Sequence, residues 1–525
     1  MQINGLSLIG SSTGSQGDSS FKAIDPSTAL NIEPTFYAAT ADETNRAVDI
    51  AQRAFLSFSK KSGAERATFL RAIADQIEAL GDTLTERAMV ESGLPEGRIK
   101  GETGRTTGQL RLFASVAEEG SWVEARIDTA LSDRQPIPKP DIRSMKRPLG
   151  PVAVFAASNF PLAFSVAGGD TASALAAGCP VIVKAHSSHP GTSELVAQAI
   201  LAAITETGMP EGTFSLLHGS GRVVGSALVT HPSIQAVGFT GSTAGGLALM
   251  KLASQRPQPI PVFAEMGSVN PLFILPGAAA NDPEGLGAGL QASVTMGVGQ
   301  FCTNPGVALV EASDSGDAVV GALVEGMSKV PSAIMLNPNI HSAYSSGVAA
   351  RCENQKVKTL VVNDDNGSGC PGVAAVFEVS ADTFLEDETL SEEIFGPETT
   401  VVRWKTKQDL MAVAEELDGQ LTATIHGTDE DFQAYAELIS ILERKVGRIV
   451  YNGFPTGVEV CPSMVHGGPF PATSDGKSTS VGTYAIERFI RLVAYQSSPQ
   501  SLLPDELKDG NPIGIWRMVN GEYSR

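Results

Sequence analysis

The segment Pro151-Val-Ala-Val-Phe-Ala156 begins a regular alternation of two sequence textures. Similar short runs rich in β-branched residues recur at 180–184, 214–217 and 234–239, and alanine-rich stretches separate them at 162–177, 191–207, 221–230 and 243–254. Strands and helices that alternate in this way predict a parallel sheet covered by helices on both faces. Ligands of such a sheet bind at the carboxyl ends of its strands.

The region before this block predicts helices and an extended arm. Thr40-Ala-Asp-Glu43 and Ser62-Gly-Ala-Glu65 are capping boxes, each followed by an apolar pattern of helical period, and a further helix is expected over 101–119. Residues 127–147 are polar and hold three prolines, which favours an extended arm or hairpin. The first 35 residues are rich in Gly, Ser and Pro, and we expect them to cross the surface in extended form.

A second alternating block follows from about 271 to 460. Its strand-like runs include Pro271-Leu-Phe-Ile-Leu275, Val307-Ala-Leu-Val310 and Arg448-Ile-Val-Tyr451. A chain of 525 residues is too long for one compact core. The sequence therefore predicts an α/β protein of at least two domains.

Composition excludes several classes of function. Fifty-eight acidic residues against 38 basic ones give a net charge of −20, and no basic stripe exists to hold a nucleic acid. No apolar run reaches the length of about 18 residues that a membrane span needs, and Met1–Ser7 has no basic region typical of a signal peptide. The five cysteines show no C-x-x-C spacing, so we expect no zinc site and a reducing, cytoplasmic setting.

Two glycine-rich turns carry the residues for a two-stage reaction. Cys302 lies in Gly299-Gln-Phe-Cys-Thr-Asn-Pro-Gly306, and Glu265 lies in Phe263-Ala-Glu-Met-Gly-Ser-Val-Asn-Pro271. A thiol can attack a carbonyl carbon, and a carboxylate can later activate water against the resulting acyl group. The pair favours an enzyme that makes and then hydrolyses an acyl-thiol intermediate.

Six motifs in order along the chain give it a resemblance to the aldehyde dehydrogenase superfamily. They are Ala157-Ser-Asn-Phe-Pro161, Val183-Lys-Ala-His-Ser187, Phe239-Thr-Gly-Ser-Thr-Ala-Gly-Gly246, Glu265-Met-Gly-Ser268, Gln300-Phe-Cys302 and Glu393-Ile-Phe-Gly-Pro397. One such motif is a modest signal, whereas six in register over nearly the whole chain are specific.

The resemblance implies a fold of three parts. A doubly wound, Rossmann-type cofactor domain is expected from residues 1–126 and 148–263, and an α/β catalytic domain from 264–478. A small oligomerisation element is expected from 127–147 and 479–525. Because the arm has too little apolar sequence to fold alone, we expect a homodimer or a dimer-based homotetramer.

The resemblance also implies the catalytic roles. Cys302 would form a thiohemiacetal with an aldehyde, and the Asn159 side chain with the Cys302 backbone N–H would stabilise its developing negative charge. Removing one such donor typically costs about 3 kcal/mol of transition-state stabilisation. Loss of hydride to a nicotinamide gives a thioester, and Glu265 would then act as general base on the hydrolytic water. A buried structural role is expected for the other four cysteines.

The same resemblance assigns the cofactor residues. Lys184 ends a strand, where it can reach a ribose or a phosphate, and Gly241 and Ser242 precede a helix whose N-terminus would face the pyrophosphate. Glu393 would hold the nicotinamide ribose, and Phe395 would pack on the ring.

One departure from the family pattern bears on which dinucleotide is bound. Many NAD users have a glutamate where this chain has Ser187, and a serine can donate to a 2′-phosphate that a carboxylate would repel. Arg222 opens the next helix and could pair with that phosphate, although a solvated helix-start cation is the simpler reading. Together with Lys184, these residues favour NADP and leave NAD open.

The substrate is indicated by a second departure. Val465-His-Gly-Gly-Pro-Phe-Pro-Ala-Thr473 replaces the common P-F-G-G-x-K-x-S-G, and this variant resembles the branch that oxidises α-ketoglutaric semialdehyde (2,5-dioxopentanoate) to 2-oxoglutarate. Arg105 is the candidate clamp for the distant carboxylate, with a helix-surface charge near Glu102 as the alternative, and Phe160 would line the tunnel. His186 and His189 lack a third clustered ligand, so we predict no metal site there.

Three rival functions stay open at this point. NADP-linked oxidation of medium or long aliphatic aldehydes fits the same motifs, since members with that activity look similar in these segments. Acyl transfer to coenzyme A would not need Glu265. A catalytically inactive structural or binding protein on this fold is disfavoured by the intact set of Cys302, Glu265 and Asn159.

Overall fold

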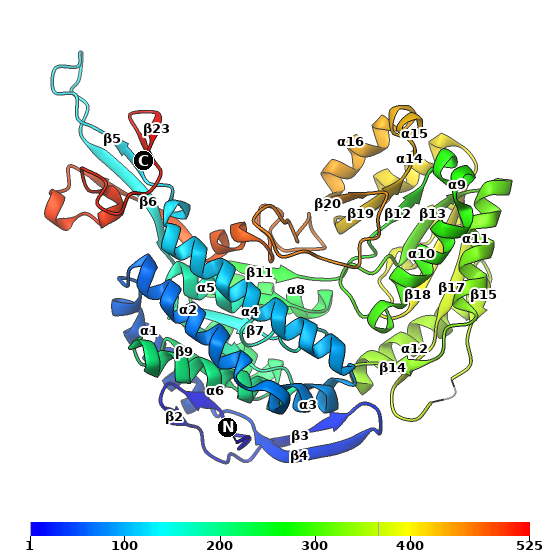
Figure 1. Ribbon diagram of the computed structural model, residues 1–525, viewed down its shortest axis with the longest axis horizontal. Helices are drawn as coiled ribbons and strands as arrows, with labels where there is room; N and C mark the ends of the chain where they lie inside the picture. Colours follow the sequence, from blue (N-terminus) through cyan, green and yellow to red (C-terminus); the bar gives the residue numbers. More distant parts are fainter. Residues whose placement is uncertain (1, 366) are drawn as a thin grey trace.

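The computed structural model describes residues 2–365 and 367–525. Two α/β bodies lie side by side, and a narrow arm projects from the first of them together with the C-terminus (Figure 1). Among the helices of these residues, none combines the length and the apolar character that a membrane crossing needs.

The first body is built on a seven-stranded sheet in the order β11-β10-β7-β8-β9-β1-β2. Its central strands are parallel, whereas β1 and β2 pair antiparallel at one edge. The strands are β7 (Val152–Phe155), β8 (Val181–Lys184), β9 (Phe214–Leu217), β10 (Ala236–Thr240), β11 (Val262–Glu265), β1 (Leu8–Ile9) and β2 (Ser12–Thr13). The predicted parallel sheet is therefore confirmed, and four of its strands lie where the sequence places them.

Helices cover both faces of this sheet, because successive strand residues point to opposite sides. Val152 and Val154 pack with α2, α4, α5 and α6, whereas Ala153 and Phe155 pack with α1, α7 and α8. The helices are α1 (Ala41–Phe58), α2 (Gly63–Glu78), α3 (Gly81–Ser92), α4 (Glu96–Glu119), α5 (Gly169–Ala177), α6 (Pro190–Thr207), α7 (Ser226–Thr230) and α8 (Thr243–Ser254). Both predicted capping boxes form, at the N-termini of α1 and α2.

Two helices differ from their predicted bounds. α4 begins at Glu96 rather than at 101, because Pro95 precedes it in extended conformation and starts the helix one turn earlier. α5 begins only at Gly169, and not at 162. The buried Glu102 carboxylate accepts hydrogen bonds from the backbone N–H groups of Leu162 and Ala163, which holds this stretch as a compact loop. In the 221–230 region, a π-helical turn (Gly221–Gly225) precedes the short α7.

The second body repeats the plan with a seven-stranded sheet in the order β15-β17-β18-β13-β12-β19-β20, in which only β15 is antiparallel. Its strands are β12 (Leu272–Ile274), β13 (Val307–Glu311), β15 (Lys358–Val362), β17 (Ala375–Ser380), β18 (Glu398–Trp404), β19 (Gln420–His426) and β20 (Val446–Tyr451). The covering helices are α9 (Pro276–Asn281), α10 (Pro283–Thr295), α11 (Asp314–Met327), α12 (Pro338–Glu353), α13 (Ala381–Glu386), α14 (Lys407–Glu416), α15 (Asp429–Ala434) and α16 (Ala436–Lys445). A two-stranded ribbon, β14 (Ala333–Ile334) with β16 (Pro371–Gly372), flanks it.

The arm is a five-stranded sheet in the order β21-β6-β5-β22-β23. The predicted hairpin is present, because β5 and β6 pair antiparallel, and the C-terminal tail adds the other three strands. The strands are β5 (Arg126–Asp128), β6 (Ile142–Pro148), β21 (Ile490–Gln496), β22 (Arg517–Val519) and β23 (Glu522–Ser524). Near the N-terminus a separate hairpin of β3 (Ser20–Asp25) and β4 (Leu30–Tyr37) gives the expected extended start.

After β20 the chain returns to the first sheet without forming a helix or a regular strand until Thr483. Figure 1 shows this stretch in orange, crossing from the second body to the first. It runs beside β11, where the Met266 N–H donates to the Ala472 carbonyl and the Ser474 N–H donates to the Ala264 carbonyl. This return segment (residues 452–482) brings a C-terminal part of the sequence to the end of β11, where Glu265 lies.

Candidate active site

The loop that carries Cys302 lies between α10 and β13 and is held in a conformation that requires glycine. Gly299 has a φ of +64°, and a Cβ atom there would lie 2.1 Å from the carbonyl carbon of Gly396. No side chain fits this approach, so only glycine lets the Cys302 loop pack on the segment Glu393–Pro397. Two of the motifs recognised in the sequence are therefore in direct contact.

Asn270 joins the same loop to the turn that follows Glu265. Its side-chain amide donates to the carbonyl of Cys302 at 2.8 Å and to that of Asn304 at 2.9 Å. Asn270 itself has a φ of +46°, a left-handed conformation that asparagine tolerates better than most residues. This residue was not predicted as functional, although it lies within the segment 263–271 that carries Glu265.

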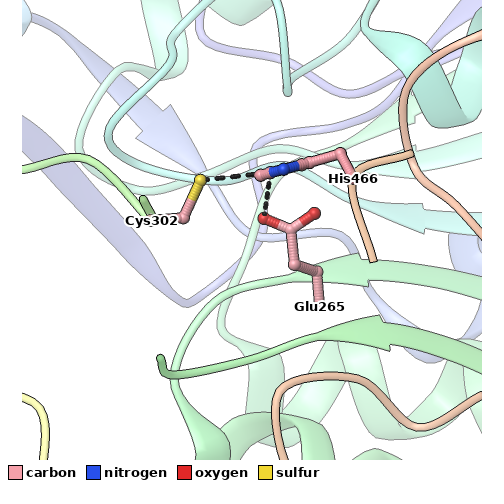
Figure 2. Close-up of side chains that lie close together, drawn as sticks. All are labelled: Glu265, Cys302 and His466. Carbon is pink, nitrogen blue, oxygen red and sulfur yellow. Dashed lines mark hydrogen bonds and ion pairs between the residues drawn. The ribbon is translucent and has the colours of Figure 1, made fainter. Parts of the chain in front are cut away.

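Cys302, His466 and Glu265 converge on one point (Figure 2). Cys302 Sγ lies 3.2 Å from His466 Nε2, and the same nitrogen lies 3.0 Å from Glu265 Oε1. The hydroxyl of Ser480 donates to the other carboxylate oxygen at 2.6 Å. His466 and Glu265 are buried, at 1% and 4% exposure. A nucleophile, a base and a carboxylate thus lie within reach of one another.

This arrangement differs from the usual nucleophile–histidine–acid triad. In that triad each ring nitrogen takes one partner, whereas here Nε2 contacts both the thiol and the carboxylate, and Nδ1 is buried without a partner. Nε2 can accept the proton of the Cys302 thiol, and once protonated it can donate to Glu265. Nε2 cannot accept from the thiol and donate to the carboxylate at the same time. The geometry therefore suits transfer of the thiol proton to His466 during the reaction.

The two acids of the cluster are shifted in opposite directions. Burial and the neighbouring charge of Glu265 raise the pKa of the Cys302 thiol well above its ordinary value. Burial acts to raise the pKa of Glu265 as well, but the contacts with His466 and Ser480 outweigh it and leave that pKa lowered. The site at rest therefore holds a thiol beside a carboxylate, and the thiol needs a base when it attacks.

His466 lies in Val465-His-Gly-Gly, a departure from the family pattern, and was not predicted to have a role. The return segment explains why the histidine matters: the Ser480 N–H donates to the His466 carbonyl at 2.8 Å, and the Thr479 hydroxyl accepts from the His466 N–H at 2.8 Å. The sequence signal that could have identified His466 is a histidine within the motif that departs from the family pattern.

Asn159, the predicted oxyanion donor, contacts the Cys302 loop, and its role stays a prediction. It follows β7 in the loop fixed by Glu102, is partly buried, and its side-chain amide donates to the Gln300 carbonyl at 3.2 Å. The amide therefore contacts the loop that carries Cys302, two residues before the thiol. Within the described residues, Glu265, Cys302 and His466 also form the one group of three whose atoms have metal-ligand spacing, all within 4.8 Å of one another.

The histidine pair that was weighed as a metal site is used otherwise. The rings of His186 and His189 stack at 5.5 Å, and the two ring nitrogens of His189 contact the Ser193 hydroxyl and the Ala157 carbonyl. His186 Nδ1 accepts from the Ser188 N–H. These contacts fix the turn between β8 and α6.

A cavity of about 570 Å³ ends at Cys302. His466 and Thr303 border the thiol, and three aromatic side chains, Phe160, Phe164 and Phe301, form much of the wall. Phe160 is 5% exposed, and its ring meets that of Phe301 edge to face at 5.3 Å between centroids. Phe160 thus lines the cavity that reaches Cys302, and its contact with a substrate stays a prediction.

Arg105 lines the same cavity, on α4. Its Nη1 donates to the Val458 carbonyl at 2.7 Å, and its guanidinium carbon lies 5.8 Å from the centre of the Phe160 ring. Burial lowers the pKa of Arg105, and the charge of the neighbouring Glu102 carboxylate counters that shift. Arg105 therefore faces the reaction chamber rather than bulk solvent, as the clamp hypothesis requires. A second arginine in the cavity, Arg98, was not predicted.

The predicted cofactor residues lie around the carboxyl ends of β8 and β10 and on the second body. Lys184 ends β8 and is 9% exposed. Ser242 is the N-cap of α8, and its hydroxyl accepts from the Gly245 N–H at 3.3 Å. The remaining members are exposed or half-buried at this end of the sheet and on the loop before β18: Ser187, Arg222, Gly241, Glu393 and Phe395. Glu393 lies next to Gly267, where a Cβ atom would be 2.8 Å from its Oε2.

Comparison with known proteins agrees with this geometry. The model of the aldehyde dehydrogenase family matches residues 13–492. The chain is 50% identical to "Alpha-ketoglutaric semialdehyde dehydrogenase 2" of Azospirillum brasilense over 99% of this chain and 100% of that one. It is 49% identical to "Alpha-ketoglutaric semialdehyde dehydrogenase" of Acinetobacter baylyi over 95% of each.

Solved structures show the same fold. An aldehyde dehydrogenase from Bacillus cereus in complex with NAD⁺ superposes with a TM-score of 0.80 at 21% identity, covering 94% of this chain and 96% of that one. An NADP-dependent enzyme from E. coli gives a TM-score of 0.80 at 22% identity, covering 94% and 98%. The family match covers most of the chain, and the thiol and carboxylate of its motifs lie close together. This chain therefore belongs to the aldehyde dehydrogenase family.

Proposed function

We propose that this enzyme oxidises 2,5-dioxopentanoate to 2-oxoglutarate, with NADP as cofactor and a thioester on Cys302 as intermediate. The observation that carries the proposal is the single cavity that has the Cys302 thiol at one end and the Arg105 guanidinium in its wall. Relatives that are about half identical over nearly their full length bear the name of α-ketoglutaric semialdehyde dehydrogenase, which supports the same substrate.

The first step is attack of Cys302 on the aldehyde carbon. Because the pKa of the thiol is raised, His466 Nε2 takes its proton as the C–S bond forms, and Glu265 stabilises the resulting imidazolium. The aldehyde oxygen gains negative charge and accepts a hydrogen bond from the Asn159 amide. Asn159 then exchanges its ground-state contact with the Gln300 carbonyl for one to the oxyanion.

A bound nicotinamide supplies the acceptor for the hydride that leaves the thiohemiacetal. The residues present fit a dinucleotide: the exposed N-terminus of α8 at Gly241 and Ser242 offers backbone N–H groups to phosphate. Among the described residues, no carboxylate pairs with the buried Lys184 ammonium, so an anionic ligand would complete it. Glu393 and Phe395 would hold the nicotinamide end against the second body.

Hydrolysis then releases the acid. Glu265 is ionised, since its pKa is lowered, and it takes a proton from the water that attacks the thioester carbon. The thiolate of Cys302 leaves and recovers its proton from His466. The presence of this buried carboxylate favours hydrolysis over acyl transfer to coenzyme A.

NADP is favoured over NAD by three groups at the adenosine end. Ser187 and Arg222 are exposed beside β8 and α7. Position 187 holds a serine in place of the glutamate that would repel a 2′-phosphate. The Lys184 ammonium adds a third donor. Initial rates with NADP and NAD for wild type and Arg222→Gln test this assignment. A loss of NADP affinity alone is expected, and equal effects on both cofactors would contradict it.

The arm is proposed as the oligomerisation element, within the three-part division of 1–126 with 148–263, 264–478, and 127–147 with 479–525. Its surface carries large apolar side chains that a monomer would leave in water, including Ile137 at 68% and Leu492 at 67% exposure. A second copy of the chain would cover them in a homodimer or a dimer-based homotetramer. The cytoplasm is proposed as its compartment, because all five cysteines are free thiols.

The decisive test compares an acidic with an apolar aldehyde. Initial rates of NADPH formation with 2,5-dioxopentanoate and hexanal, and identification of 2-oxoglutarate as product, are expected to show a strong preference for the acid. The aromatic wall of the cavity favours oxidation of medium or long aliphatic aldehydes as the second candidate, and a higher kcat/KM for hexanal would establish that function instead. Cys302→Ala should abolish both reactions, which would exclude a non-catalytic role.

A further inference from the structure

Arg98 is held in the substrate cavity by two aromatic rings. Its guanidinium carbon lies 4.4 Å from the centre of the Phe160 ring and 4.8 Å from that of Phe301. These rings stand perpendicular to each other, so they confine the guanidinium plane from two directions. Arg98 lies on α4 seven residues before Arg105, and that spacing puts both side chains on one face of the helix.

One buried carboxylate lies near both arginines and is ion-paired with Arg98. Glu102 lies between them on the same helix face, is fully buried as a side chain, and contacts Arg98 Nη2 through Oε2 at 3.3 Å. Its other oxygen, Oε1, accepts from the N–H groups of Leu162 and Ala163. Burial raises the pKa of Glu102, whereas Arg98 and these two N–H groups lower it. At most one negative charge therefore stands against two positive charges.

The other carboxylate that lines the cavity does not restore the balance. Glu459 is exposed at the rim and accepts a hydrogen bond from the Val460 N–H, so solvent screens its charge. Away from this rim, the cavity wall holds two arginines against one carboxylate, a positive excess that matches a substrate with one carboxylate. The aromatic wall would otherwise make an unpaired cation costly there.

The number of donors exceeds what one carboxylate needs. Arg105 contacts the protein through the Val458 carbonyl, Arg98 through Glu102, and the Nε group of each arginine has no partner. A carboxylate is held well by a single guanidinium fork. A 2-oxo acid presents an additional carbonyl oxygen beside its carboxylate, and a second fork is suited to bind that oxygen.

We propose that Arg98 forms, together with Arg105, a subsite for a 2-oxo carboxylate, in which Arg105 binds the carboxylate and Arg98 binds the 2-oxo oxygen. This inference rests on the proposed function, since it assumes an acidic aldehyde with its aldehyde carbon at Cys302. It makes Arg98 the residue that distinguishes 2,5-dioxopentanoate from 5-oxopentanoate, which has the same chain length and carboxylate but no 2-oxo group.

Glu102 acts in this subsite as a positioning residue. One of its oxygens fixes Arg98, and the other fixes the loop of residues 157–168 that carries Asn159 and Phe160. The same carboxylate therefore sets the distance between the subsite and the oxyanion donor. A substrate bound by both arginines is held with its aldehyde at a defined distance from that donor.

The test is the kcat/KM of wild type, Arg98→Gln and Arg105→Gln with 2,5-dioxopentanoate, 5-oxopentanoate and pentanal. Arg98→Gln is expected to lower kcat/KM for 2,5-dioxopentanoate by about 10- to 100-fold and to change the value for 5-oxopentanoate by less than about threefold. Arg105→Gln should lower kcat/KM for both acidic substrates. Neither substitution should lower the value for pentanal.

Two further variants keep the result interpretable. Lys100→Gln removes a cation from the same helix at an exposed ion pair with Glu96, and it should leave all three substrates unaffected. Arg98→Lys keeps the charge without the planar fork and should still lose most of the 2-oxo preference. Melting temperatures show whether each variant is folded.

The outcomes separate the two proposals. A wild type that does not prefer either acid over pentanal would reject the proposed function. If wild type prefers both acids and Arg98→Gln lowers kcat/KM for both equally, or for neither, the 2-oxo subsite is wrong. The proposed function would still stand. A specific loss on 2,5-dioxopentanoate supports both.

Discussion

The two ends of the substrate cavity differ in how their charges are balanced. At the Cys302 end, the thiol, the imidazole of His466 and the carboxylate of Glu265 are all in contact, and each has a partner within the protein. At the other end, Arg98 is ion-paired with the buried carboxylate of Glu102, Arg105 donates to the Val458 carbonyl, and the Nε group of each arginine has no partner.

This difference suggests that the Cys302 end carries out the reaction and that the arginine end selects the substrate. The reactive groups are in contact with one another before any substrate arrives, so they can act on any aldehyde that reaches the thiol. An end with excess positive charge is completed only by an acidic ligand. Substitutions at the Cys302 end should therefore lower activity with every aldehyde. The effect of substitutions at the arginine end should depend on which aldehyde is supplied.

The largest effect is expected at the nucleophile. Cys302→Ala removes the atom that forms the intermediate, and kcat should fall by at least about 10⁴-fold with every aldehyde. Steady-state assays of NADPH formation measure the loss, and binding of NADP followed by calorimetry serves as the control for folding. Residual activity within tenfold of wild type would show that the covalent route is wrong.

The next effect in size is expected at His466, and it should depend on pH. His466→Gln removes the base, so kcat/KM should fall by about 10²- to 10³-fold near pH 7 with acidic and apolar aldehydes alike. Because the pKa of the Cys302 thiol is raised, its thiolate fraction increases with pH. The variant should therefore recover activity as pH rises toward 10, whereas wild type should change much less.

A pH profile of the variant that runs parallel to that of wild type would contradict this role. Thr303→Ser, which alters another residue lining the cavity beside the thiol while keeping its hydroxyl, provides a matched control. It should leave both the rate and the profile close to those of wild type.

A smaller and selective effect is expected at Arg105. Arg105→Gln removes a charged donor from the cavity wall, so kcat/KM for 2,5-dioxopentanoate should fall by about 10- to 100-fold. The value for hexanal should stay the same or rise, because the substitution also removes a cation from an aromatic wall. Equal losses of kcat/KM for both aldehydes would contradict the proposed difference between the two ends of the cavity.

The smallest effect concerns the cofactor, at a distance from both ends. Burial lowers the pKa of Lys184 to about 8, so its positive charge is present at pH 7 and lost as pH rises through 8. The KM for NADP should rise by roughly threefold between pH 7 and pH 9, and Lys184→Arg should abolish this change because its charge persists. A flat KM in the wild type would remove Lys184 from the cofactor site.

Much of the fold could be predicted from local patterns. The strands at 152–155 and 181–184 and the capping boxes at Thr40 and Ser62 depend on nearby residues, and they appear where expected. The delayed start of α5 could not be predicted, because Glu102 fixes residues 162 and 163 from a distant helix. Long-range contacts of this kind leave no periodic signal in the sequence.

The site was predicted unevenly for the same reason. Cys302 and Glu265 lie in recognisable glycine-rich turns, and they meet as expected. His466 reaches them only through the return segment, which has no regular strand or helix to announce its path, although it pairs with β11 at Thr473. Arg98 carries no motif of its own, and its place in the cavity depends on two phenylalanine rings from different parts of the chain.

The most direct test of the account is the ratio of kcat/KM for 2,5-dioxopentanoate to that for hexanal, measured by NADPH formation in wild type, His466→Gln and Arg105→Gln. The account predicts a large ratio in wild type, the same ratio in His466→Gln despite a much lower rate, and a ratio reduced by about 10- to 100-fold in Arg105→Gln. A ratio that changes in His466→Gln and not in Arg105→Gln would contradict the separation of chemistry from selection.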